Sequence, residues 1–178
     1  MAEQPEAVAG NLIVLEQAID ALERVPDAVY AGLGQAPGQS PVGAHFRHVF
    51  DHYRAFLAGV EAGAIDYDAR ERGTAVEHDR TLALATARGF ASAIARLPLD
   101  TLPRRLQVSV RSVAGEDDAP DWSGSTVKRE LQFLVSHTVH HYALIKLLLE
   151  QVGVETAAGF GVAPSTLQAR QRATACAR

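Results

Sequence analysis

The residues of this chain most able to do chemistry are its histidines, and six of the seven fall in two short windows. The first window holds His45, His48 and His52, and the second holds His137, His140 and His141. Neutral imidazole is the commonest protein ligand for zinc, copper, nickel and iron. Two such windows, each inside a helical pattern, therefore predict a divalent-metal site between two helices.

The second window has the clearer geometry. His137 and His141 are four residues apart and so share one face of a helix, whereas His140 points away from it. The same face carries the apolar residues of this segment, so the two imidazoles are expected to be buried and to need partners or a metal. Glu130 lies two turns earlier on this face, where it could accept a hydrogen bond from a ligand's second nitrogen.

The first window leaves the third ligand open. His45, His48 and His52 all lie along one edge of an apolar helical stripe, and His48 is the farthest from its centre. Periodicity alone therefore favours His45 or His52 and does not choose between them.

The elements that must position these histidines are four helical segments. Apolar residues at helical spacing predict helices over residues 11–33, 41–62, 74–97 and 125–151. Thr74 and Glu77 are expected to form a capping box at the start of the third helical segment. One helical turn is expected after Ser165.

A strand is predicted between the third and fourth helical segments. Leu106, Val108 and Val110 alternate with polar residues within residues 102–114, as in a half-buried strand, and residues 115–124 are expected to form a loop. The strand needs a partner, from the same interlude or from a second subunit in a homodimer.

Composition bounds the class of protein. The 178 residues, 47% of them hydrophobic, suit a single domain over residues 1–178 with a core at about 11–152 and a tail at about 153–178. A net charge of -4 without a basic stripe argues against nucleic acid as a partner. The lone Cys176 excludes an internal disulfide framework, and we expect neither a signal peptide nor a membrane span. The expected location is therefore the cytoplasm.

Two motifs resemble the DinB/YfiT-like superfamily. The stretch Ser40-Pro41-Val42-Gly43-Ala44-His45-Phe46-Arg47-His48 resembles the start of that family's second helix, where a histidine about eight residues after Ser or Thr is a metal ligand. The stretch His137-Thr138-Val139-His140-His141 resembles the HxxxH of its last helix. The resemblance implies an all-α, DinB-like four-helix bundle with a short strand interlude before the last long helix.

The resemblance also implies a ligand set. It selects His48 with His137 and His141 around one zinc, nickel or iron ion. A supporting shell is then expected from His45, Asp51, His52 and Glu130, since Asp51 sits where the family often has an acidic residue. One departure is that Tyr142-Ala143-Leu144 follows the second HxxxH histidine, where members often have Arg-Gly-Gln.

The function implied is thiol-dependent S-transfer, with a low-molecular-weight thiol as cofactor and a small-molecule substrate. Metal-dependent hydrolysis is the second candidate, because three histidines leave a metal open to water as well as to a thiol. The third is a non-enzymatic stress-response or binding protein with a structural metal, closed by His52 as a fourth ligand.

The charged residues 66–72 are expected to be a solvated loop, the alternative being an arginine that binds an anionic substrate.

Overall fold

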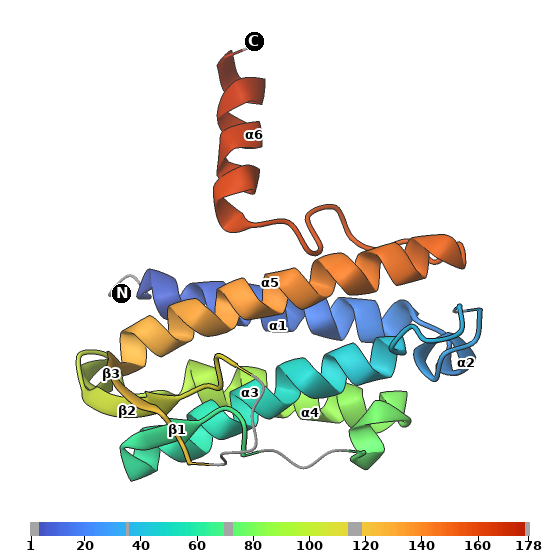
Figure 1. Ribbon diagram of the computed structural model, residues 1–178. Coiled ribbons are helices and arrows are strands. Elements are labelled where there is room, and N and C mark those ends of the chain that lie inside the picture. Colours follow the sequence, from blue (N-terminus) through green and yellow to red (C-terminus); the bar gives the residue numbers. More distant parts are fainter. Residues whose placement is uncertain (1–3, 35, 70–72, 114–118, 177–178) are drawn as a thin grey trace.

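The computed structural model describes residues 4–34, 36–69, 73–113 and 119–176 (Figure 1). Its α-helices are α1 (Glu6–Arg24), α2 (Asp27–Tyr30), α3 (Val42–Ala62), α4 (Arg80–Ala95), α5 (Val127–Gln151) and α6 (Pro164–Cys176). It also has two short 3-10 helices, η1 (Ala75–Glu77) and η2 (Leu99–Thr101). Its three strands are β1 (Ala64–Asp66), β2 (Arg105–Ser109) and β3 (Trp122–Thr126). The chain is mostly helical, as expected, but the described part has six α-helices, so a bundle of four is not confirmed.

The long helices α1, α3, α4 and α5 lie side by side and enclose the core (Figure 1). Their inward stripes supply most of the fully buried side chains, including Leu15, Leu22, Phe46, Phe50, Leu131 and Ile145. Buried Asn11 links three of these helices, because its side-chain N–H groups donate to Ala7 and Leu131 carbonyls and its oxygen accepts from the Tyr53 hydroxyl. The helices that carry the two histidine windows, α3 and α5, are therefore held in direct contact.

Four predictions about the helices were wrong. The first helix begins at Glu6 and not at residue 11. The first segment breaks at Pro26, which lacks an N–H and disfavours helical geometry at Val25, so α1 ends at Arg24 and a short α2 follows. The third helix is capped by Asp79, whose carboxylate accepts from the Leu82 N–H, and not by Thr74. The tail forms the 13-residue helix α6 instead of a single turn.

The predicted strand exists and is the middle strand of a three-stranded sheet in the order β1-β2-β3. β3 pairs with β2 antiparallel from within the interlude, and β1 pairs with it parallel from the loop after α3. β3 occupies part of the stretch expected to be a loop. Leu106 and Val108 are buried as expected, whereas Val110 lies beyond the strand and is exposed. Pairing of this strand is thus supplied by the same chain.

The last helix, α6, stands away from the other helices (Figure 1). The segment before it is attached to α5 by Phe160, which is buried and stacks on Tyr142 with ring centroids 4.6 Å apart. Gly161, with φ +68°, follows in a close approach, since a Cβ there would lie 2.6 Å from the backbone nitrogen of Ala143. Among the described helices, none has the length and apolar content needed to cross a membrane.

Candidate metal centre

Helix α3 presents the first histidine window at a seam with α5. Its apolar residues Phe46, Val49 and Phe50 are fully buried, which turns the edge carrying His48 and His52 toward the neighbouring helix. His48 is half-buried and His52 is buried. The sequence expectation that α3 and α5 face one another through their histidines is therefore met.

Three imidazoles lie close enough to hold one metal ion. In His48, His52 and His137 one ring nitrogen from each residue lies within 4.8 Å of the others. The Nε2 atoms of His48 and His137 are 3.1 Å apart. Two nitrogens bound to one tetrahedral zinc at ~2.0–2.1 Å lie about 3.3–3.4 Å apart, so this pair already has nearly the spacing of two ligands.

The ring planes distinguish the histidines around this pair. His48, His137 and His141 are mutually inclined, by 58°, 65° and 57°, with centroids 4.5–4.9 Å apart. His52 instead stacks on His137, with centroids 3.9 Å apart and planes 26° from parallel. Its Nδ1–H donates to the His48 carbonyl at 2.9 Å. The group with the closest nitrogens thus contains His52 in place of the expected ligand His141, and the two residues also differ in how their rings meet His137.

His141 also contacts the remaining histidine of the first window. Its Nδ1 lies 3.2 Å from Nδ1 of His45, so one ring donates a hydrogen bond to the other. Metal-bound histidines usually engage their second nitrogen in a hydrogen bond. His140 is exposed and meets His141 only edge-on, as its position on the far side of the helix predicts.

The electrostatics of the cluster favour neutral imidazole. Burial, followed by the neighbouring His52, His141, His48 and His140, lowers the pKa of His137 from 6.5 to about 2. Burial and then His140 also lower the pKa of His45. Nδ1 of His137 is buried without a hydrogen-bond partner among the described residues. A ring that stays neutral in water near neutral pH is ready to act as a metal ligand.

The low pKa of His137 makes the metal-free protein less stable in acid. The folded state keeps this ring neutral while the unfolded chain binds a proton near pH 6.5, so the unfolded state holds more protons below that pH. The free energy of unfolding is therefore unaffected by this ring above pH 6.5. It decreases as pH falls toward 2, by at most about 1.4 kcal/mol per pH unit for one proton.

Urea unfolding of metal-free protein at pH 7.5, 6 and 5 measures this slope. We expect His137→Gln to reduce the dependence of the free energy of unfolding on pH. His78→Gln, at an exposed site, should leave this dependence unchanged. Equal slopes in both variants would contradict the prediction.

Asp51 is buried beside the cluster, but its carboxylate is engaged by arginines. One oxygen accepts from Arg47 at 2.7 Å and the other from Arg54 at 2.6 Å. Arg47 also binds Glu77 at 2.8 Å, which ties α3 to η1. The orienting role expected for Asp51 remains a prediction, and its observed contacts are ion pairs with two arginines of its own helix.

Glu130 is buried, as its helical position predicted, and one of its partners is a tyrosine. Tyr67 donates its hydroxyl to Glu130 at 3.0 Å, and the Tyr67 ring stacks on His52 with centroids 5.1 Å apart. Sequence reasoning missed Tyr67, because it lies in a charged stretch with no periodicity. The only available signal was an aromatic residue among polar ones next to a short apolar run.

The loop after β1 is polar and partly exposed. Asp66 accepts from the backbone N–H groups of Asp68 and Ala69, and Asp68 accepts from the Arg111 N–H. Asp68 and Ala69 are exposed, as expected of a solvated loop, whereas that expectation was wrong for Asp66, which ends β1, and for Tyr67, which is buried. The arginines considered as anion-binding groups, Arg70 and Arg72, lie outside the described residues.

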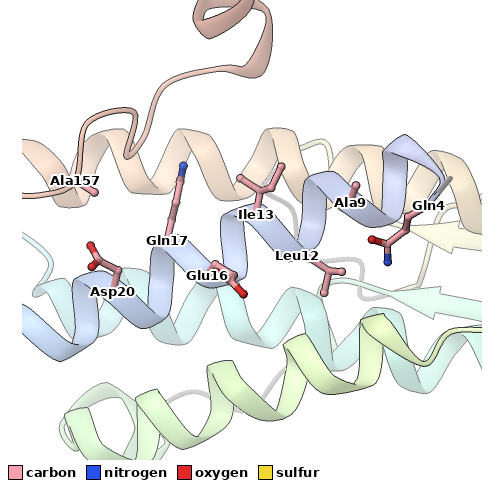
Figure 2. Close-up of a pocket in the computed structure, with 8 residues that line it drawn as sticks. All are labelled: Gln4, Ala9, Leu12, Ile13, Glu16, Gln17, Asp20 and Ala157. Carbon is pink, nitrogen blue, oxygen red and sulfur yellow. The ribbon is translucent and has the colours of Figure 1, made fainter. Parts of the chain in front are cut away.

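A separate hollow of about 470 Å³ lies on the outer side of α1 (Figure 2). It is lined by Gln4, Ala9, Leu12, Ile13, Glu16, Gln17, Asp20 and Ala157. It shares no residue with the histidine cluster, and Asp20 in its wall is paired with Arg24 at 2.6 Å. Its lining contains no imidazole, so the histidine cluster is the better candidate for a metal.

Comparison with known proteins agrees with this architecture. The sequence model of the DinB superfamily matches residues 14–145, which include both histidine windows. The crystal structure of a DinB-like protein from Bacillus subtilis superposes with a TM-score of 0.63, covering 88% of this chain and 99% of that chain. At 14% identity this likeness shows the fold alone.

A fungal protein shares part of the sequence. FK506-binding protein 5 of Rhizopus delemar is 32% identical over 104 residues, which are 58% of this chain and 27% of the fungal protein. The chain thus corresponds to about a quarter of that relative's length.

Proposed function

The chain belongs to the DinB superfamily, and we propose that it holds one divalent metal ion through His48, His137 and His141 and uses it in thiol-dependent S-transfer. The observation that carries the proposal is the approach of the His48 and His137 Nε2 atoms to 3.1 Å, from two different helices. Zinc, nickel and iron all accept imidazole nitrogen.

The choice of His141 over His52 as third ligand is supported by ring orientation. An ion bound to an imidazole nitrogen lies close to the plane of that ring. The planes of His52 and His137 are 26° from parallel at 3.9 Å, so one ion fits both poorly. The inclined rings of His48, His137 and His141 allow their planes to meet at one point.

The residues present suit such an ion. The donors are imidazole nitrogens, and burial lowers the pKa of His137 so that its ring stays neutral. When bound there, a divalent cation lowers the pKa of a thiol or a water placed beside it, so that a nucleophile is available at neutral pH. The His45–His141 contact orients the third ring, and partial exposure of His48, His137 and His141 leaves a side open to a small molecule.

We take α1, α3, α4 and α5 as the bundle of this superfamily, with α2, α6 and the sheet added to it. Residues 1–178 are proposed to act as one domain in the cytoplasm, and association into a homodimer is to be tested by size-exclusion chromatography with light scattering.

A thiol-consumption assay tests the activity. Zinc-loaded protein is incubated with low-molecular-weight thiols and an electrophile such as 1-chloro-2,4-dinitrobenzene, and free thiol is followed over time. We expect consumption above the protein-free rate, and its loss in His48→Ala. Hydrolysis of ester or amide substrates without thiol would instead favour the metal-dependent hydrolase. Neither activity, with the metal still bound, would favour a non-enzymatic protein with a structural ion.

A further inference from the structure

Tyr67 is held in place by the sheet. It directly follows β1 and is buried, with 3% of its surface exposed. Its backbone N–H donates to the carbonyl of Ser109, the last residue of β2, at 3.0 Å. The position of its Cα is therefore set by strand pairing and not by the loop that follows.

The Tyr67 hydroxyl is held by α5. It donates to Oε2 of Glu130, which lies in the first turn of that helix and is 2% exposed. The other carboxylate oxygen of Glu130 accepts from the Ser125 hydroxyl at 2.5 Å and from Arg129 at 3.3 Å. A buried carboxylate with all these partners has little freedom to move. The Tyr67 ring is thus clamped at both ends.

The clamped ring lies against the histidine cluster. It stacks on His52 with centroids 5.1 Å apart and planes 18° from parallel, and His52 in turn stacks on His137 at 3.9 Å. The His52 Nδ1–H bond to the His48 carbonyl limits rotation of the middle ring. Three nearly parallel rings therefore connect the sheet to a proposed ligand.

Resting on the proposed metal centre, we infer that Tyr67, clamped by Glu130, is a positioning residue that sets the plane of the His137 imidazole through His52. A ligand ring fixed before binding loses less conformational freedom when the ion arrives, and an ion is held well only when each ring is aimed at it. Glu130 thus supports the centre through an aromatic stack, where a direct hydrogen bond to a ligand had been expected. His52 acts in this stack as a spacer.

Cobalt titration of the full-length protein tests this inference. Co²⁺ affinity is measured by competition with a chelator, and the visible d–d absorption reports the geometry around the ion. Tyr67→Leu removes the stack and should weaken affinity about 10–100-fold and change the d–d band. Tyr67→Phe keeps the ring but frees it from Glu130, and should weaken affinity about 3–10-fold.

Tyr30→Phe is the matched control. Tyr30 is also fully buried and donates its hydroxyl to a backbone carbonyl, that of Val76, at 2.6 Å, but no histidine ring stacks on it among the described contacts. It should lower stability while leaving cobalt affinity and the d–d band unchanged.

The other possible results of the cobalt titration separate a failure of this inference from a failure of the metal proposal. Wild-type affinity and band in both Tyr67 variants would overturn the inference and leave the metal proposal standing. Absence of cobalt binding by the wild type would overturn both. If Tyr67→Leu does not fold by circular dichroism, Tyr67→Phe alone decides by the same criteria.

Discussion

Replacing His137 by alanine should release most of the bound metal and weaken zinc affinity by more than about 100-fold, beyond the effect of a supporting residue. The same is expected for His48→Ala, because the Nε2 atoms of the two residues lie 3.1 Å apart and no carboxylate is expected to replace either one. Elemental analysis after dialysis, followed by competition titration with a chelator, measures both losses.

The third ligand is decided by a matched pair of variants. His141→Ala should lose metal as fully as His137→Ala, whereas His52→Ala should weaken binding only about 10–100-fold, as expected for a ring that stacks on a ligand. His78→Ala and His140→Ala, both at exposed positions, should retain the metal. Release by His52→Ala together with retention by His141→Ala would move the site to the group with the closest nitrogens, His48, His52 and His137.

The second large effect is expected at Gly43, in the first turn of α3. A Cβ there would lie 2.0 Å from the carbonyl oxygen of Glu77 and 2.8 Å from the Tyr30 ring, and neither the backbone nor the packed ring can move aside freely. Gly43→Ala should therefore separate η1 from α3 and lower the free energy of unfolding by about 3 kcal/mol or more. Urea denaturation followed by circular dichroism measures the change.

Gly89→Ala is the control for this substitution. Gly89 lies within α4, is exposed, and a Cβ there would meet nothing within 4 Å. The helical backbone accepts alanine better than glycine, so this variant should gain about 0.5–1 kcal/mol. A Gly43→Ala protein as stable as wild type would show that η1 can leave α3 without cost, and the close packing of these elements would then contribute nothing to stability.

Sequence reasoning worked best where the signal is local. The shared face of His137 and His141 follows from helical periodicity within five residues, and the bounds of α3 and α5 lie within about two residues of those expected. The burial of Glu130 follows from the same periodicity. Pro26 was also a local signal for the break after α1, and it was outweighed wrongly by the apolar pattern on either side.

Contacts between segments far apart in the sequence could not be predicted from local patterns. The strand at Arg105–Ser109 was predictable by its alternation, but β1 is only three residues long and β3 is mostly polar, so neither has a pattern of its own. Strand pairing is satisfied by backbone groups, which every sequence carries alike. The helix α6 was underestimated because it is polar all round and has no apolar periodicity to detect.

The amino-acid sequence by itself determined that two helices carry histidines and that one of them places two imidazoles on a single face, where the structure leaves both half-buried. Only the tertiary structure decided which ring meets which: that His48 faces His137, that His52 stacks on His137, and that Tyr67 joins Glu130 across 63 positions. The physical reason is that periodicity defines the direction of a side chain around its own helix axis. The crossing of α3 and α5 and the register of the sheet, which set distances between elements, depend on packing of the whole core.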